Sequence, residues 1–296
     1  MPRLVLKRIL KGRKGSYQVI KSLAENLKLF INEVNTYQYN CIAKSPYIRF
    51  LREYINNGES DCLVFEWMDS ILWETKEENT QAKAKVFKTV AKSCLEALAT
   101  FRDMDGTGQY IHADLNPNNI LVSGFSNSTP ATKLADLGWT TRADSKEERV
   151  IRIQGDAIRA PEIWKGPSPI PACDIWALGV SLAHWMSSRI MFGVGGCNIK
   201  TNHPREVTDA GWCIAKLHKM RRAKLEGPVE DRYVMECAIA DKLLSQNLVQ
   251  TLTTSEELEQ KQVPSEYIAF IEHLLVIDPK KRPSVVEALA HPLLRT

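Results

Sequence analysis

A short segment from Ile111 to Val122, IHADLNPNNILV, gathers small polar side chains between apolar residues. It places Asp114 and Asn119 five positions apart, in a stretch that Pro117 predicts to be a loop. Carboxylate and amide oxygens are ligands that Mg²⁺ prefers, and a carboxylate can also accept the proton of an attacking hydroxyl. The residue types therefore suit phosphoryl transfer, with Asp114 as the base and Asn119 as one metal ligand.

A second acidic residue follows a short distance along the chain. Asp136 stands in LADLGW, two positions before Gly138, whose missing side chain allows the backbone to turn. Metal ions that bridge nucleotide phosphates need more than one oxygen ligand from the protein. We therefore predict that Asp136 lies near Asn119 and supplies the second metal ligand.

Further motifs follow in a fixed order. The chain resembles the eukaryotic protein kinases, in which H-x-D-L-x-P-x-N, D-L-G, A-P-E, D-x-W-x-x-G and R-P-S occur in this sequence. Each motif is weak alone, whereas five in order are specific. The matching segments are His112–Asn119, Asp136–Gly138, Ala160–Glu162, Asp174–Gly179 and Arg282–Ser284. The D-L-G form, APEIW and VFEWMD are similar to fungal kinase-like proteins near the splicing-factor and cyclin-dependent branches.

The resemblance implies a role for each residue of this site. Asp114 would orient the substrate hydroxyl, while Asn119 and Asp136 would bind the magnesium ions on the nucleotide phosphates. It also implies an ATP pocket with a thin glycine loop above it, Phe65 at its back and a hinge over Glu66–Met68. The residues implied in ATP binding are Gly12, Gly15, Val19, Phe65, Glu66, Met68 and Leu121.

Four more residues would support the site by resemblance. Glu33 would lie on the helix that faces a strand lysine. Glu162 would pair with Arg282 in a buried ion pair, and Asp174 would bond to the backbone of the catalytic loop. His112 is expected to be a structural hydrogen-bonding group rather than a catalyst.

One part of the family pattern is missing. The family has a strand ending in V-A-I-K between its glycine loop and the helix with the glutamate. Here Glu33 follows Gly12 by 21 residues, and no such stretch lies between them. Lys21 and Lys28 stand in other contexts, with Lys28 predicted at the start of the helix. Three explanations stay open: another lysine substitutes, the enzyme is crippled, or an exon is absent from the sequence.

Three further positions depart from the family. Asn116 replaces a lysine that neutralises the γ-phosphate, which predicts weaker charge stabilisation. Ala113 replaces an arginine that pairs with a phosphorylated activation loop, which predicts no dependence on such phosphorylation. Asp156 stands where a threonine is expected before A-P-E.

Two alternative functions compete with a protein kinase. HADLNPNN also resembles the loop of aminoglycoside and choline phosphotransferases, which lack the A-P-E segment and the D-x-W-x-x-G helix. A pseudokinase, a scaffold or nucleotide-binding module with little catalysis, is favoured by the missing lysine. D-L-x-P-x-N indicates serine or threonine, rather than tyrosine, as the acceptor. We therefore predict a serine/threonine protein kinase that uses ATP and Mg.

The elements that must position this site differ between the two parts of the chain. Residues 1–68 combine the strand-like runs Leu4–Leu6 and Cys62–Phe65 with a helix over Leu29–Tyr39. Residues 69–296 are mainly helical. The pattern indicates an α+β, two-lobed fold, one kinase domain over 1–296, whose strand-rich small lobe ends at residue 68.

Helical periodicity is clearest in the second part. Apolar residues from Val86 to Phe101 form one stripe on a helix that starts near Gln81 and ends near Asp105. Residues 174–186 are apolar nearly all round, which is typical of a buried helix. Ser284 begins a capping box for a short helix.

The composition is that of a globular protein, with 296 residues, 44% hydrophobic and a net charge of +4. No apolar run has the roughly 20 residues of a membrane span. Seven cysteines without a C-x-x-C pair favour a reducing, intracellular compartment, either cytoplasm or nucleus. We expect a protein substrate, no membrane contact and no direct nucleic-acid partner.

Overall fold

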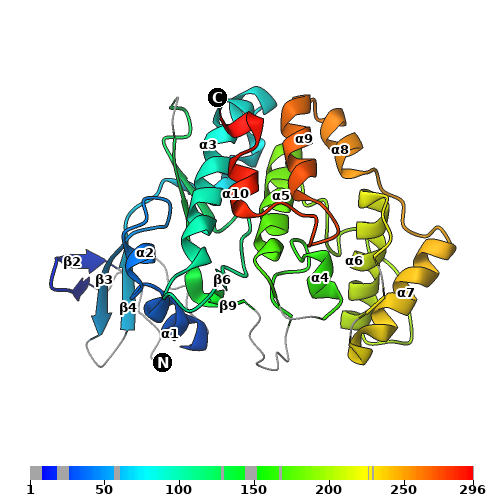
Figure 1. Cartoon of the computed structure of the whole chain (residues 1–296), viewed down its shortest axis with the longest axis horizontal. Coiled ribbons are helices and arrows are strands. Elements are labelled where there is room, and N and C mark those ends of the chain that lie inside the picture. Colours follow the sequence, from blue (N-terminus) through cyan, green and yellow to red (C-terminus); the bar gives the residue numbers. More distant parts are fainter. Residues whose placement is uncertain are drawn as a thin grey trace.

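A computed structural model of the chain describes residues 9–18, 27–56, 61–127, 130–143, 152–166, 169–225, 227–228 and 230–295 (Figure 1). The fold is mixed α+β, with small sheets toward the N-terminus and a helical C-terminal part. The predicted strand Leu4–Leu6 and the predicted nucleotide contact Val19 lie outside the described residues.

Two β-hairpins and a helix dominate the N-terminal part. The elements are β1 (Ile9–Lys11), β2 (Ser16–Gln18), α1 (Leu27–Thr36), α2 (Asn40–Ala43), β3 (Leu51–Asn56) and β4 (Asp61–Phe65). In the second hairpin Leu51 pairs with Phe65, and a bulge follows between Leu51 and Glu53. The residues of β3 alternate between less and more exposed positions, so one face of this hairpin can turn toward the rest of the molecule.

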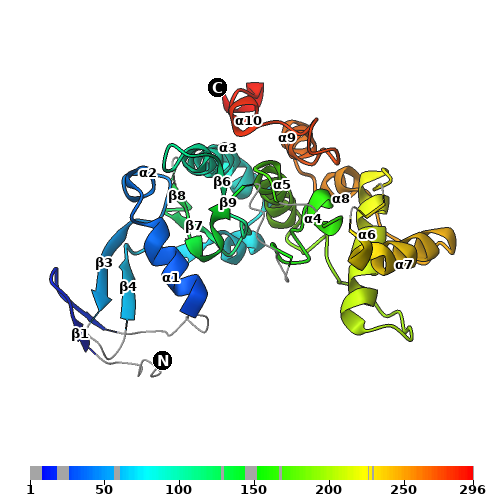
Figure 2. The ribbon, with the colours of Figure 1, turned by 60° about the horizontal axis from the view of Figure 1, so that its bottom comes forward.

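The two hairpins form separate two-stranded sheets among the described residues. Only residues 19–26 separate β2 from α1. In Figure 2 the β1–β2 hairpin lies beyond β3, at the outer edge of the molecule.

The C-terminal part holds most of the helices. Its elements are β5 (Ser70–Ile71), η1 (Leu72–Glu77), α3 (Thr80–Ala99), η2 (Thr100–Arg102), β6 (Tyr110–Ile111), β7 (Ile120–Ser123), β8 (Ala131–Leu134), η3 (Leu137–Trp139), β9 (Thr141–Arg142), α4 (Pro161–Trp164), α5 (Ala172–Ser187), α6 (Arg205–Arg221), η4 (Asp231–Tyr233), α7 (Val234–Ser245), α8 (Thr254–Gln260), α9 (Ser265–Leu274), α10 (Val285–Leu289) and η5 (Pro292–Leu294). Two small sheets, β5-β7-β8 and β6-β9, carry the loops of interest.

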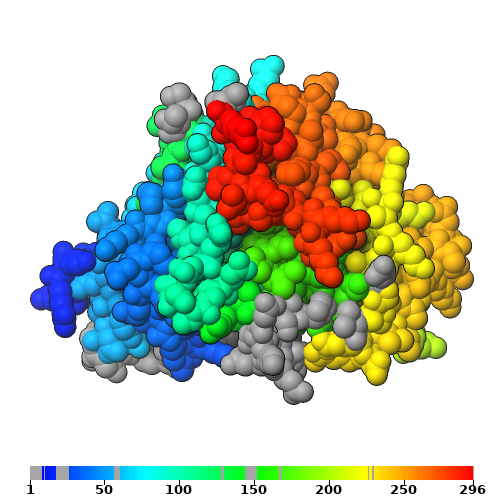
Figure 3. Space-filling view, in the orientation of Figure 1, coloured from blue at the N-terminus to red at the C-terminus, as the bar shows by residue number. Residues whose placement is uncertain are grey.

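Helix α5 lies at the centre of the core. Every one of its residues after Ala172 is buried. Phe87 of α3 stacks on Tyr267 of α9 with ring centroids 4.5 Å apart, and on Trp185 of α5 at 6.4 Å. The C-terminal segment with α10 and η5 packs against α3, as the space-filling view shows (Figure 3). This apolar packing makes the helical part a stable base for the sheets.

The local predictions for helices are confirmed with small shifts. The predicted helix over Leu29–Tyr39 begins two residues earlier and ends at Thr36. The helix with the apolar stripe ends at Ala99 and continues as a short 3₁₀ turn to Arg102. Ser284 caps α10 through a capping box with Glu287.

All seven cysteines are free thiols. None of the helices in the described part of the chain combines the length and apolar character needed to cross a bilayer.

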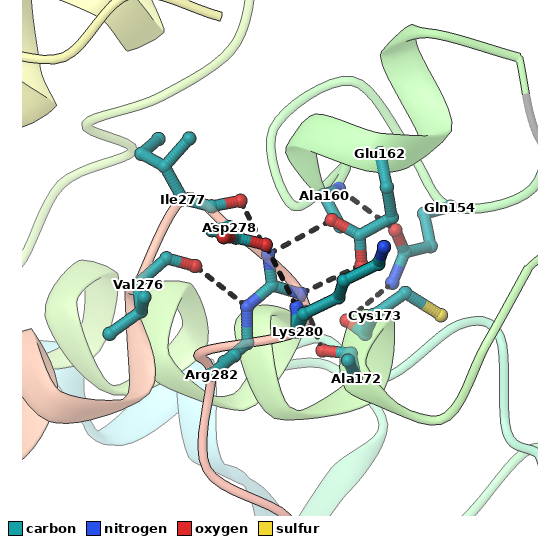
Figure 4. Close-up of polar contacts among 10 residues, drawn as sticks. All are labelled: Gln154, Ala160, Glu162, Ala172, Cys173, Val276, Ile277, Asp278, Lys280 and Arg282. Atoms are coloured by element: carbon teal, nitrogen blue, oxygen red, sulfur yellow. Dashed lines mark hydrogen bonds and ion pairs between the residues drawn. The ribbon is translucent and has the colours of Figure 1, made fainter.

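A buried ion pair joins the A-P-E segment to the C-terminal part (Figure 4). Arg282 donates from Nη1 to Oε1 of Glu162 at 2.7 Å and from Nη2 to Oε2 at 2.9 Å. The arginine also donates to the carbonyls of Val276 at 2.8 Å and Ala172 at 2.7 Å. A bidentate pair with its remaining donors satisfied is the arrangement in which burying both charges is tolerated.

Arg282→Met is expected to lower the free energy of unfolding by about 3–5 kcal/mol, because it leaves Glu162 buried and unpaired. Urea denaturation followed by circular dichroism measures the loss. The control is Arg205→Met, which breaks the exposed Arg205–Asp209 pair and should cost at most about 1 kcal/mol. Equal losses in the two variants would contradict a special role for the buried pair.

Candidate active site

The predicted catalytic loop lies between β6 and β7, and hydrogen bonds from asparagine side chains hold its conformation. Asn119 donates from Nδ2 to both the backbone oxygen and Oδ2 of Asp114, each at 2.9 Å. Asn116 donates to the same backbone oxygen at 3.0 Å and accepts from the N–H of Asn118 at 2.9 Å. The side chain of Asn116 is thus used to hold the loop, and Asp114 is aimed by Asn119.

The loop rests on the carboxylate of Asp174, at the start of α5. Oδ2 accepts from the N–H of His112 at 2.7 Å and Oδ1 from that of Ala113 at 3.1 Å. Ala113 has a φ of 66°, in the left-handed region that costs an alanine about 1–2 kcal/mol. Burial raises the pKa of Asp174 to about 7, although the two N–H groups favour the ionised form. The predicted contact between Asp174 and the loop backbone is therefore present.

His112 links this loop to the segment before Asp136. Its Nε2 donates to the carbonyl of Ala135 at 3.0 Å, and its Nδ1 accepts from the N–H of Asp114 at 3.2 Å. These two bonds require a neutral ring with its proton on Nε2. Burial lowers the pKa of His112 to about 4, which favours that neutral form. The ring therefore acts as a structural connector.

Asp136 stands directly after β8, with a φ of 61°. The N–H of Ala135 donates to the carbonyl of Asn119 at 2.9 Å, so the two polar loops are held together. Gly138 follows, and a Cβ there would lie 3.2 Å from the Cβ and carbonyl of Leu29 in α1. Burial, and after it the charge of Asp136, raise the pKa of Asp114 to about 6. Asp114, Asn119 and Asp136 are thus brought together.

The oxygens of this trio suit magnesium. Because Nδ2 of Asn119 is the donor to Asp114, its Oδ1 is the atom that can bind a metal. Within the described ranges there is no group of three or more His, Cys, Asp and Glu residues that could hold a metal ion. One carboxylate and one amide oxygen, completed by phosphate oxygens and water, match the way Mg²⁺ is usually bound.

Helix α1 docks on the segment that follows Asp136. Asn32 donates from Nδ2 to the carbonyls of Gly138 at 2.8 Å and Thr140 at 2.7 Å. Glu33 accepts from the N–H of Leu137 at 3.3 Å. Burial, and then the charge of Asp136, raise the pKa of Glu33 to about 7. The helix is therefore held on the metal-binding loop by hydrogen bonds, with Glu33 facing that loop.

The lysine expected opposite Glu33 is not found at Lys28, which is exposed in the first turn of α1. Lys21 lies outside the described residues. The ion pairs formed by described residues include none between Glu33 and a lysine, and Arg49 is the cation whose charge acts on Glu33.

The predicted hinge residues gather at the end of β4 and beside β7. Phe65 packs on Tyr37, the residue directly after α1, with ring centroids 5.6 Å apart. The carboxylate of Glu66 accepts from Lys133 of β8 at 2.6 Å and from the N–H of Phe50 at 2.7 Å. Met68 accepts a weak hydrogen bond from Ser123 at the end of β7, and Leu121 is buried in the same strand. These contacts tie the segment after β4 to the sheet that leads to Asp136.

The predicted glycine loop, the turn between β1 and β2, contacts β3. In the turn between β1 and β2, the N–H groups of Arg13 and Lys14 donate to the carboxylate of Glu53 in β3. A Cβ on Gly12 would collide with that carboxylate. A cavity of about 780 Å³ lies between this turn and β3. Gly12 thus lies against β3, and no hydrogen bond or ion pair among the described residues joins the turn of Gly12 and Gly15 to Asp114 or Asp136.

Three residues of this region were missed by reading the sequence. Asn32 precedes Glu33 and has no motif of its own. Lys133 is the one charged residue of the short strand β8, which was a weak signal. Arg49, in the run Ile-Arg-Phe before β3, was a stronger one, because a charge between two apolar residues at the start of a strand often has a partner.

Glu33→Gln is expected to stabilise the chain relative to wild type as the pH rises. The pKa of Glu33 is raised from 4.5 to about 7, so the unfolded chain releases this proton first and ionisation opposes folding above pH 4.5. The gain should be absent near pH 4 and reach at most about 3 kcal/mol above pH 7. Urea unfolding at several pH values measures it, with the exposed Glu266→Gln as control. A gain that does not change with pH would contradict the assignment.

Comparison with known proteins agrees with this geometry. Residues 13–294 match the family described as "Protein kinase domain". Homeodomain-interacting protein kinase 2 of Mus musculus is 24% identical over 277 residues, covering 83% of this chain and 22% of the relative. Homeodomain-interacting protein kinase 4 of Homo sapiens is 34% identical over 185 residues, covering 58% of this chain and 28% of the relative. Cyclin-dependent kinase 8 of Drosophila melanogaster is 23% identical over 256 residues, covering 82% and 56%.

The chain thus spans about a quarter of the length of the homeodomain-interacting relatives. The family match extends over nearly the whole sequence, from the glycine turn to the last 3₁₀ turn. It includes the A-P-E and D-x-W-x-x-G segments, which the small-molecule phosphotransferases lack. The chain belongs to the protein kinase domain family.

Proposed function

We propose that the chain transfers the γ-phosphoryl group of Mg-ATP to serine or threonine hydroxyls of proteins. The observation that carries the proposal is the convergence of three side chains, in which Asn119 bonds to Asp114 and the Asn119 backbone bonds to the residue before Asp136. The names of the relatives, all kinases, support the reaction class. The serine or threonine assignment rests on the D-L-x-P-x-N motif.

In this proposal Asp114 is the catalytic base. The substrate hydroxyl oxygen attacks the γ-phosphorus, the bond from that phosphorus to the β,γ-bridging oxygen breaks, and ADP leaves. The hydroxyl proton passes to the carboxylate of Asp114, which Asn119 holds by a 2.9 Å bond to Oδ2. Positioning and electrostatic stabilisation supply most of the rate in such reactions, so the rigidity of this loop matters more than any covalent chemistry.

Magnesium, when bound, would neutralise the developing charge on the phosphates. Asn119 and Asp136 would hold it. We place the adenine against Leu121, with Phe65 at the back of the nucleotide pocket and the backbone of Glu66–Met68 as the hinge. The boundary between a small lobe over 1–68 and a large lobe over 69–296 belongs to the same proposal.

A pseudokinase is the second candidate, and a specific observation favours it. The amides of Arg13 and Lys14, which would cradle phosphates, bind Glu53 instead. Asn116 also uses its side chain inside the loop rather than toward a phosphate. Such a module would bind nucleotide weakly, or bind a partner, without transferring phosphate.

The first test measures ATP binding by calorimetry with and without magnesium, and then transfer of labelled phosphate to a generic protein substrate. Asp114→Asn is expected to keep Mg-ATP binding and lower kcat by about 10²–10⁴-fold, because the base is lost. Asp136→Asn should remove the magnesium dependence of binding together with transfer. The control Asp231→Asn changes an exposed aspartate and should leave both unchanged.

Three outcomes separate the candidates. Magnesium-dependent binding with transfer that both changes abolish supports a kinase. Binding without transfer by the wild-type chain supports the pseudokinase. If the wild-type chain neither binds ATP nor transfers phosphate, both the kinase and the nucleotide-binding proposals are wrong.

The pH dependence of kcat/KM gives a second test. Asp114 must be ionised to accept a proton, and its pKa is about 6 in the chain without ligands. The value of kcat/KM is therefore expected to fall as the pH drops through about 6, by tenfold for each further unit. Rates measured from pH 5 to pH 8 with a constant ionic strength would show it. Residual activity of Asp114→Asn should lack this inflection, and a flat wild-type profile would rule out the base.

A further inference from the structure

Arg49 is held at the meeting point of three elements that carry the site. Its N–H donates to the carbonyl of Leu134, two residues before Asp136, at 2.8 Å. Its own carbonyl accepts from the hydroxyl of Tyr37, the residue directly after α1 and four positions after Glu33, at 2.7 Å. The backbone of Arg49 therefore has a set position relative to both Glu33 and Asp136.

The side chain of Arg49 lies across the end of β4. Its Cζ is 4.8 Å from the centre of the Phe65 ring, which is a cation–π distance. Its Nε donates to the carbonyl of Glu66 at 3.2 Å. The terminal Nη1 and Nη2 groups form no hydrogen bond with the described residues. A half-buried guanidinium thus lies at the back of the proposed nucleotide pocket with its two terminal groups available.

The charges around Arg49 explain why a cation belongs there. Burial, and after it the negative charge of Asp136, disfavour the ionised form of Glu33. Glu66 already has Lys133 as its partner at 2.6 Å. The guanidinium of Arg49 is the positive charge that acts on Glu33, and it favours the ionised carboxylate. Without it, two acidic groups would face an anionic nucleotide with little compensation.

We propose that Arg49 takes the place of the missing strand lysine, facing Glu33 and holding the α- and β-phosphates of bound nucleotide through its terminal NH₂ groups. This assignment rests on the proposed binding of Mg-ATP. An arginine suits the task because its planar fork bonds to two phosphate oxygens at once and keeps its charge when partly buried. It reaches the site from the segment before β3 rather than from a separate strand, so the short connection between β2 and α1 can be tolerated.

The test compares nucleotides that differ in phosphate. In Arg49→Met, Mg-ATP should bind about tenfold more weakly or worse, because a charged hydrogen-bonding partner is lost. Adenosine, which has no phosphate, should bind as in wild type. Arg49→Lys keeps the charge and should recover part of the loss. The matched control is Arg52→Met, which changes an exposed arginine three positions along the same segment and should alter neither ligand.

A second readout needs no nucleotide. Arg49→Met, Glu33→Gln and the double variant form a cycle whose unfolding constants should depart from independence by about threefold or more at pH 8. The coupling should vanish at pH 5, where Glu33 is protonated. The other titratable groups that face this pair, Asp136, Tyr37 and Glu66, are the same in all four proteins, so their contributions cancel.

The outcomes distinguish this inference from the proposed function. Wild-type binding of Mg-ATP that Arg49→Met weakens without affecting adenosine supports both. Mg-ATP binding that Arg49→Met leaves intact overturns the role of Arg49 while the kinase proposal stands. An equal loss of ATP and adenosine binding also overturns it, because the side chain would then only shape the pocket. No binding by the wild-type chain overturns both.

Discussion

The carboxylate of Asp174 is the constraint on which the site depends. It lies in the first turn of α5, a helix whose residues after Ala172 are all buried, where the helix dipole favours a negative charge. By accepting from the N–H groups of His112 and Ala113 it holds Ala113 in a left-handed conformation. The following residue, Asp114, then points toward Asn119. The buried helix α5 thus fixes the position of the proposed base, Asp114, through the hydrogen bonds of Asp174.

A series of hydrogen bonds extends from the loop held by Asp174 to the N-terminal part of the molecule. His112 and Asn119 bond to Ala135, which positions Asp136. The segment after Asp136 binds α1 through Asn32 and Glu33, and Tyr37, directly after that helix, donates to the backbone of Arg49. Each step is a hydrogen bond between groups far apart in the chain. The N-terminal helix is therefore held by the loop it is proposed to serve, and a change in one will be felt in the other.

The β1–β2 hairpin stands outside this network. Its turn binds Glu53 on β3, and its strands pair only with each other among the described residues. The same backbone N–H groups that donate to a carboxylate can donate to a phosphate, because both are anions that bind to paired N–H groups. The geometry at the turn is thus suited to an anion, while its location differs from that expected of a loop above the nucleotide. For this reason we propose Arg49, rather than the β1–β2 turn, as the main phosphate-binding group of the N-terminal part.

The sequence by itself was enough to predict the protein kinase family and much of the local structure. The order of motifs, the buried helix over 174–186 and the capping box at Ser284 depend on neighbouring residues, so local periodicity and spacing were sufficient to predict them. Tertiary structure alone decided that Asn116 serves the loop, that the glycine turn lies on Glu53, and that Arg49 packs on Phe65 beside the carbonyl of Glu66. These depend on contacts between segments that are distant along the chain, whose packing no local pattern encodes.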